Sequence, residues 1–178
     1  MMEDFCYKAY PIACFILDQN MSSREQMDFL EKMYGHEFEY LPFYYKQNKK
    51  NFILSVMQVL NYLTDKEKID AEFPAIEQDF SDIGMHYDKE RIFSDYTNMD
   101  MFFMLVRLRI LYGQGKAYVR IKLKTLLGHY GYKRRSLQIN EHIRDCLMFY
   151  HIQPFLRDNE ECDIRDIKID DMLTFRLL

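Results

Sequence analysis

Residues 117–150 read AYVRIKLKTLLGHYGYKRRSLQINEHIRDCLMFY, and this stretch decides the fold of the C-terminal half. Between residues 117 and 123, apolar residues alternate with basic ones, which is the pattern of a short, half-buried strand. A helix that starts at Lys124 follows, and its apolar side is formed by Leu123, Leu126 and Leu127. Residues 128–131, with a glycine at each end, then predict the end of this helix in a turn.

A longer helix is predicted after the turn. Ser136 is its expected N-cap, because a serine side chain at that position accepts a hydrogen bond from a first-turn N–H group. One face of the helix is apolar and consists of Ile139, Ile143, Cys146, Leu147 and Tyr150. The other face is polar and carries Gln138, Glu141, Arg144 and Asp145. The spacing therefore predicts an amphipathic helix packed against the rest of this half.

The tail completes the pattern. Apolar residues in 163–169 and 172–178 flank Asp170 and Asp171, which predicts a β-hairpin. Strand, helix, turn, helix and hairpin in this order resemble a winged helix-turn-helix over about residues 99–178, with core and turn positions at Leu127, Gly131, Ile139 and Ile143. The resemblance implies that the second helix enters the DNA major groove by its first turns.

The distribution of basic residues along the sequence is consistent with a DNA partner. Residues 101–140 contain nine Lys and Arg and no Asp or Glu, in a chain of formal net charge -4. A basic block of this kind concentrates positive potential on one part of an acidic protein. Two of the nine, Arg107 and Arg109, lie in a predicted apolar helix over 99–112, so we expect them to have internal partners.

The resemblance also assigns roles to the remaining polar and basic residues of the block. Those expected to face bases or phosphates are Arg134, Arg135, Ser136 and Gln138, with Asn140 and His142 as further candidates. Those expected to lie on the nucleic-acid backbone are Arg120, Lys122, Lys124 and Lys133.

The N-terminal region, residues 1–98, is predicted to be helical. A capping box at Ser22 and Glu25 starts a helix over 23–34 that stops at Gly35, and an amphipathic helix covers 48–63. The opening segment is expected to be broken by Pro11, and residues 36–45 are expected to be irregular or extended. Their aromatic residues are predicted as core, with a dimer surface as the alternative, and are Phe38, Tyr40, Phe43, Tyr44 and Tyr45.

The predicted fold class is therefore α+β and mainly helical. It consists of a helical region 1–98 and a winged-helix-like region 99–178 that ends in a β-hairpin, with one continuous domain as the alternative. The acidic stretch 65–100, with eleven acids and four bases, is expected to connect the two.

Motifs for catalysis and metal binding are not evident. The four cysteines form no Cys-x-x-Cys pair, and each is expected to act as a small buried hydrophobe. The histidines show no His-x3-His spacing, and His129 and His142 are expected to lack a neighbouring set of Cys or carboxylate ligands. The segment Gly113-Gln114-Gly115-Lys116 lacks the earlier glycine and the hydroxyl of a phosphate loop. We therefore expect no catalytic residues, no metal and no cofactor.

The sequence thus predicts a non-enzymatic nucleic-acid-binding or regulatory protein that contacts DNA through a basic winged-helix-like face. The alternative is an acidic protein-interaction module or inhibitor that docks on a larger protein or nucleoprotein machine, through residues 65–100 or 158–171. The Met1-Met2-Glu3-Asp4 start and the short apolar runs predict a cytoplasmic protein without membrane spans. Many Tyr, Phe and Met and no Trp are typical of AT-rich coding sequence, which indicates a bacterial or phage source. The role that we expect for the protein belongs to a phage or defence context.

Overall fold

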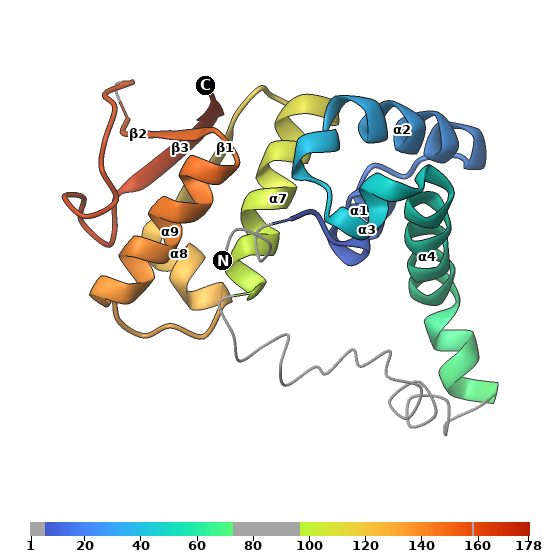
Figure 1. The fold of residues 1–178 in the computed structure, drawn as a ribbon. Coiled ribbons are helices and arrows are strands. Elements are labelled where there is room, and N and C mark those ends of the chain that lie inside the picture. Colours follow the sequence, from blue (N-terminus) through green and yellow to red (C-terminus); the bar gives the residue numbers. More distant parts are fainter. Residues whose placement is uncertain (1–5, 73–96, 158) are drawn as a thin grey trace. The chain divides into compact units, whose positions relative to one another are not determined.

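The computed structural model describes residues 6–72, 97–157 and 159–178, and these belong to two compact units, Met1–Arg91 and Ile92–Leu178 (Figure 1). Most of the acidic stretch 65–100 lies outside the described residues, as does Asp158 of the second acidic segment. The predicted domain boundary near Asn98 stays a prediction.

The first unit is helical. Its described elements are α1 (Ala9–Asp18), α2 (Ser23–His36), the 3-10 helix η2 (Phe38–Tyr40), α3 (Phe43–Gln47) and α4 (Lys49–Glu72). Helix α1 packs along α4 and buries Ile12, Phe15 and Ile16. The ring of Phe15 meets that of Phe29 from α2, with 5.3 Å between the ring centroids. Burial of these large apolar side chains holds the helices of this unit together.

Helix α2 confirms the predicted capping box. The backbone N–H of Ser22 donates to Glu25 at 2.7 Å, and the N–H of Glu25 donates back to the Ser22 hydroxyl at 3.4 Å. The expected break at Pro11 is wrong, because α1 runs through this residue. Pro11 lies in the first turn of α1, where a missing N–H group interrupts no intrahelical hydrogen bond.

The aromatic segment forms η2 and α3 rather than an irregular or extended piece. The core prediction is confirmed for Tyr40, which is buried and stacks edge-on with Tyr7. It is wrong for Phe38, Phe43 and Tyr44, which are 41%, 69% and 60% exposed, while Tyr45 is half-buried. Phe43 and Tyr44 begin a helix of five residues after Pro42, and successive positions of a helix point about 100° apart, so only one side of it can face the core.

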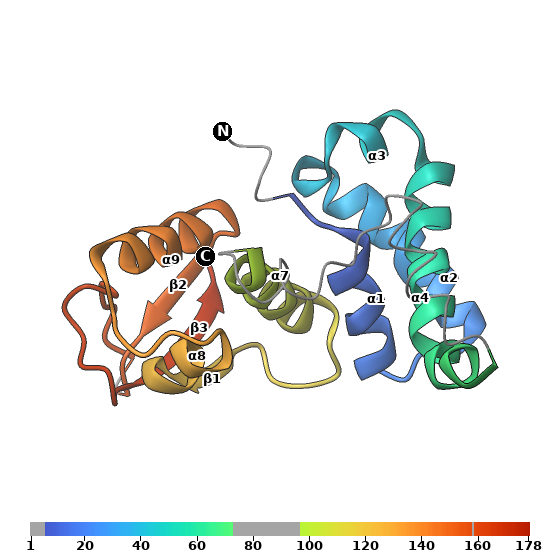
Figure 2. The ribbon, with the colours of Figure 1, turned by 90° about the horizontal axis from the view of Figure 1, so that it is seen from below.

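The second unit combines three helices with a small sheet. Its elements are α7 (Thr97–Tyr112), β1 (Val119–Lys122), α8 (Leu123–His129), α9 (Leu137–Phe149), β2 (Ile152–Phe155) and β3 (Met172–Leu177). The strands form an antiparallel sheet in the order β1-β3-β2. Figures 1 and 2 show α7, α8 and α9 gathered on one side of the sheet. The mainly helical α+β fold is confirmed.

The core of the second unit lies between the sheet and these helices. Phe175 of β3 is buried, and its ring contacts Phe102 and Phe103 of α7 at centroid distances of 6.2 and 5.6 Å. The five residues of the predicted apolar face of α9 are all buried. Ser136 caps α9 as predicted, since its hydroxyl accepts from the Ile139 N–H at 3.2 Å. The strand and helices predicted from residues 117–150 are thus confirmed as β1, α8 and α9.

The predicted hairpin is only half correct. Strand β3 is confirmed, but its hairpin partner is β2 and not residues 163–169. Pro154 lies in β2, which a proline without an N–H group permits because β2 is an edge strand. Ile164 and Ile167 are buried three residues apart in a turn rather than in strand alternation.

Candidate nucleic-acid interface

The sheet has one face turned away from the helices. Residues paired across an antiparallel sheet lie on the same face, so the pairing of Arg120 with Thr174 and of Thr174 with Phe155 defines a row. The strand residues on this outer sheet face are Arg120, Lys122, Gln153, Phe155, Met172, Thr174 and Arg176. Three of these seven described residues are cations and none is acidic.

Aromatic rings lie among the cations of the outer sheet face. The Arg176 guanidinium lies 5.2 Å from the centroid of the Phe155 ring. Just before β1, Tyr118 has the Arg120 guanidinium 5.1 Å and the Lys116 ammonium 5.4 Å from its ring centroid. A hydrogen bond with Lys116, and the charges of Lys116, Arg120 and Arg176, lower the pKa of Tyr118. Four cations and two rings therefore share one surface with the exposed acid Glu161, which pairs with Phe155 at the edge of β2. Acidic Asp170 and Asp171 lie directly before β3.

The eight residues predicted to bind nucleic acid come from several elements. Arg120 and Lys122 lie on the outer sheet face, and the Arg120 Nε donates to the Thr174 hydroxyl at 3.1 Å. Lys124 is the second residue of α8, and its Nζ lies 3.9 Å from Asp170. The remaining five lie in the turn before α9 or in its first turn, and are Lys133, Arg134, Arg135, Ser136 and Gln138.

Within that group, Arg135 is engaged by backbone. Its guanidinium donates to the carbonyls of Ile164, Ile167 and Arg165 at 3.1, 2.6 and 3.3 Å. Ser136 is occupied as the cap of α9. Lys133 and Arg134 are exposed, as is Gln138. Arg135 thus binds the backbone of residues 164–167, while its neighbours Lys133 and Arg134 remain exposed.

The exposed side of α9 is not basic. Its charged residues are Glu141, Arg144 and Asp145, and the Arg144 Nε lies 3.7 Å from Asp163. The expectation that Asn140 and His142 face nucleic acid is wrong, because neither side chain is exposed. Asn140 is buried on the apolar side of the helix, and the side chain of His142 is only 18% exposed. Acidic side chains on the outward face would oppose insertion of α9 between phosphate backbones.

His142 belongs to a buried Asp–His–Cys cluster. Its Nε2 lies 2.6 Å from the Oδ1 of Asp100, whose side chain is 5% exposed. The Cys146 thiol donates to the same Oδ1 at 3.2 Å, and its Sγ lies 3.7 Å from the His142 Nε2. Asp100 lies in the first turn of α7, where the helix dipole favours a carboxylate.

The cluster overturns the expectation that His142 has no neighbouring Cys or carboxylate. Cys146 follows His142 by four residues on α9, which places both side chains on the same side of the helix. The His-x3-Cys spacing was a usable signal in the sequence. Asp100, 42 residues before His142, gave no comparable signal.

The chemistry of the cluster does not suit a cysteine nucleophile. The thiol and the carboxylate both meet Nε2 of the ring, whereas a catalytic relay uses the two ring nitrogens separately. Burial, followed by the charge of Asp100, strongly raises the pKa of Cys146, so the thiol stays protonated at neutral pH. The oxygen, nitrogen and sulfur atoms of the cluster lie within 4.8 Å of one another and are of the types that bind transition metals.

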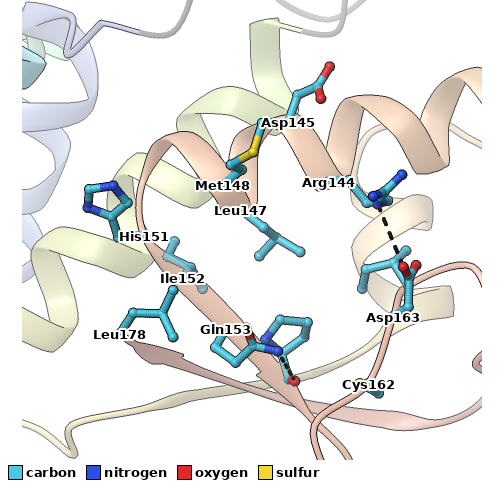
Figure 3. Close-up of a pocket in the computed structure, with 12 residues that line it drawn as sticks. Arg144, Asp145, Leu147, Met148, His151, Ile152, Gln153, Cys162, Asp163 and Leu178 are labelled. Atoms are coloured by element: carbon cyan, nitrogen blue, oxygen red, sulfur yellow. Dashed lines mark hydrogen bonds and ion pairs between the residues drawn. The ribbon is translucent and has the colours of Figure 1, made fainter.

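A surface cleft of about 440 Å³ lies beside α9 and β2 (Figure 3). Leu147, Ile152 and Leu178 supply apolar walls, while Arg144 and His151 lie toward opposite ends. Burial and nearby acids raise the pKa of Cys162, which also lines the cleft, to about 11. The cleft therefore offers no activated nucleophile.

Among the helices that the structure describes, none combines the length and the apolar character required to cross a bilayer. No family model, no curated protein and no solved structure matches the chain.

Proposed function

We propose that the second unit binds nucleic acid, preferentially single-stranded, through the outer sheet face. The observation that carries the proposal is the close association of Arg120 and Arg176 with the rings of Tyr118 and Phe155. Single-stranded nucleic acid is bound by surfaces of this type, because cations meet the phosphates while unpaired bases stack on aromatic rings.

The charges of the unit favour this surface over helix α9. The seven strand residues of the outer sheet face include three cations and no acid, and one acid, Glu161, adjoins them beside Phe155. The exposed side of α9 carries two acids, Glu141 and Asp145, beside the single cation Arg144. A sheet is also broad enough to present several rings to successive bases, which a single helix in a groove does not do. We therefore move the proposed contact from Arg134, Arg135 and the start of α9 to the sheet.

The order of elements supports the likeness to winged helix-turn-helix proteins. Strand, helix, turn, helix and two paired strands occur in the expected sequence as β1, α8, α9, β2 and β3. The proposed role is that of a non-enzymatic nucleic-acid-binding or regulatory protein. In winged helix-turn-helix proteins the second helix contacts DNA, whereas here the proposed contact is made by the sheet.

Fluorescence polarisation with a labelled 20-mer of deoxythymidine and a duplex of the same length tests this proposal. We expect the single strand to bind more tightly at low salt, and Arg120→Glu with Lys122→Glu to weaken binding at least tenfold. The control is Arg24→Glu with Lys50→Glu, which makes the same charge change at exposed residues of the first unit and is expected to leave binding nearly unchanged.

Absence of single-strand binding by the unmutated protein would overturn the proposal. Preference for the duplex, with loss of binding in Arg134→Glu but not in Arg120→Glu, would place the contact at α9. Recovery of a stoichiometric protein partner from nuclease-treated host lysate, together with no oligonucleotide binding, would instead favour the acidic interaction module.

A further inference from the structure

We propose that Asp100, His142 and Cys146 form a binding site for one Zn²⁺ ion that links helix α7 to helix α9. The three side chains each offer one ligand atom, a carboxylate oxygen, an imidazole nitrogen and a sulfur, and these atoms all lie within 4.8 Å of one another. The proposal is independent of nucleic-acid binding, because none of the three residues belongs to the outer sheet face.

The distances between the three atoms suit a single ion. Zn–N and Zn–O bonds are about 2.0–2.2 Å and Zn–S bonds about 2.3 Å, so neighbouring ligand atoms of a tetrahedral site lie about 3.3–3.6 Å apart. The Cys146–Asp100 and Cys146–His142 separations, 3.2 and 3.7 Å, are each within a few tenths of an ångström of these values. The His142–Asp100 separation of 2.6 Å is the length of a hydrogen bond and must open by about 0.7 Å to admit the ion.

The chemistry of the ligands selects the metal. Mg²⁺ and Ca²⁺ prefer several oxygen ligands, and the cluster offers one carboxylate. Zn²⁺ binds oxygen, nitrogen and thiolate together. Binding of the ion displaces the proton of the Cys146 thiol, which is released to solvent. The resulting thiolate, the Asp100 carboxylate, the neutral imidazole and Zn²⁺ together have zero net charge, which suits the buried positions of Asp100 and Cys146.

The helices position the ligands before the ion arrives. His142 and Cys146 lie one turn apart on α9, and Asp100 lies in the first turn of α7. Because the ligands come from two helices, binding energy gained by the ion adds to the stability of their packing. The side chain of His142 retains some exposure and offers an entry path, and three protein ligands leave a fourth position for water.

A titration of the full-length, chelator-treated protein with Co²⁺ tests the proposal. Co²⁺ reports its ligands, since a bound thiolate gives a charge-transfer band in the near ultraviolet and a tetrahedral site gives visible ligand-field bands. We expect both to saturate at one equivalent and to vanish when Zn²⁺ is added. Zn²⁺ should also raise the Tm of the unmutated protein by several degrees.

Variants assign the ligands. Cys146→Ser should abolish the charge-transfer band, whereas Cys162→Ser, the same change at a cysteine outside the cluster, should retain it. His142→Gln and Asp100→Asn should each weaken Co²⁺ binding at least tenfold. Circular dichroism establishes that each variant is folded; if Cys146→Ser does not fold, His142→Gln and the spectrum of the unmutated protein decide.

Three results would overturn the proposal and leave a hydrogen-bonded cluster only. The first is an unmutated protein that gives no thiolate charge-transfer band. The second is a band that persists in folded Cys146→Ser or disappears in folded Cys162→Ser. The third is Co²⁺ affinity unchanged in both folded His142→Gln and folded Asp100→Asn.

Discussion

The guanidinium of Arg135 donates a hydrogen bond of 2.6 Å to the backbone carbonyl of Ile167. Further bonds to the carbonyls of Ile164 and Arg165 make this side chain the point at which the β2–β3 connection is attached to the start of α9. The sequence placed Arg135 among the nucleic-acid contacts, but the structure shows a cation whose donors are engaged by the protein itself.

Arg135→Ala is therefore expected to lower the free energy of unfolding by about 2–3 kcal/mol, because up to three carbonyls lose a charged donor. Arg134→Ala, at the exposed neighbouring position, is expected to change it by less than about 0.5 kcal/mol. Urea denaturation followed by circular dichroism compares the two. Equal effects from both substitutions would show that the loop contact contributes no stability.

Ser136→Ala is expected to destabilise the protein by about 1 kcal/mol, because the first turn of α9 loses the hydroxyl that accepts from the Ile139 N–H. Ser136→Asp restores an acceptor and adds a favourable charge at the helix N-terminus, so it should match the unmutated protein or exceed it. Thermal unfolding of both variants provides the measurement. A Ser136→Asp protein as unstable as Ser136→Ala would contradict a capping role.

The free energy of unfolding should decrease at acidic pH as Asp163 becomes protonated. Hydrogen bonds from the side chain and the backbone N–H of Arg165 lower the pKa of Asp163 to about 2, below the value of about 3.9 in an unfolded chain. A depressed folded-state pKa contributes stability that is complete above about pH 4 and is lost as the pH falls toward 2.

Asp163→Asn should remove this part of the pH dependence while it retains an oxygen for the Arg165 N–H. Urea midpoints between pH 2.5 and 6 are expected to vary less in the variant than in the unmutated protein. Asp18→Asn, at an exposed residue of the first unit, serves as the control. Identical pH profiles for all three proteins would rule out the contribution of Asp163.

Binding of single-stranded nucleic acid should depend on salt in proportion to the cations engaged. If Lys116, Arg120, Lys122 and Arg176 each neutralise one phosphate, the slope of log K against log salt should be about -2.8. Replacing Arg120 and Lys122 by glutamine should bring it to about -1.4. Polarisation titrations at four salt concentrations measure both slopes. A slope that is unchanged in the variant would exclude these two residues from phosphate contact.

Elements with strong helical periodicity were predictable from the sequence. Helices α2 and α9 were predicted with their N-caps, because Ser22 and Ser136 precede clear apolar stripes. The pairing of β3 with β2 was not predicted, since Pro154 argues against a strand and the two strands are separated by a 16-residue connection. Ile164 and Ile167 in that connection are buried in a turn, but in the sequence their spacing was interpreted as that of a strand.

The candidate sites show the same limit. The alternation of Arg120 and Lys122 in β1 was visible in the sequence, but Phe155 and Arg176 join them only through strand pairing across the sheet. The cluster at Asp100 likewise depends on packing of α7 against α9, which no local pattern encodes. Spacing within one helix could have linked His142 to Cys146, and the third residue required the tertiary structure.

The strand order β1-β3-β2 has a consequence for solution behaviour. The outer edge of β1 is not covered by another described strand of the unit, whereas the outer edge of β2 is partly covered by residues 160–162, which pair with it at Phe155. Uncovered strand edges promote self-association of chains. Pro154 interrupts the edge of β2, and the cations of β1 discourage pairing with a second molecule. Alanine at Arg120 and Lys122 would leave an almost wholly apolar edge strand that is prone to aggregate, so these two basic residues protect solubility whatever ligand they bind.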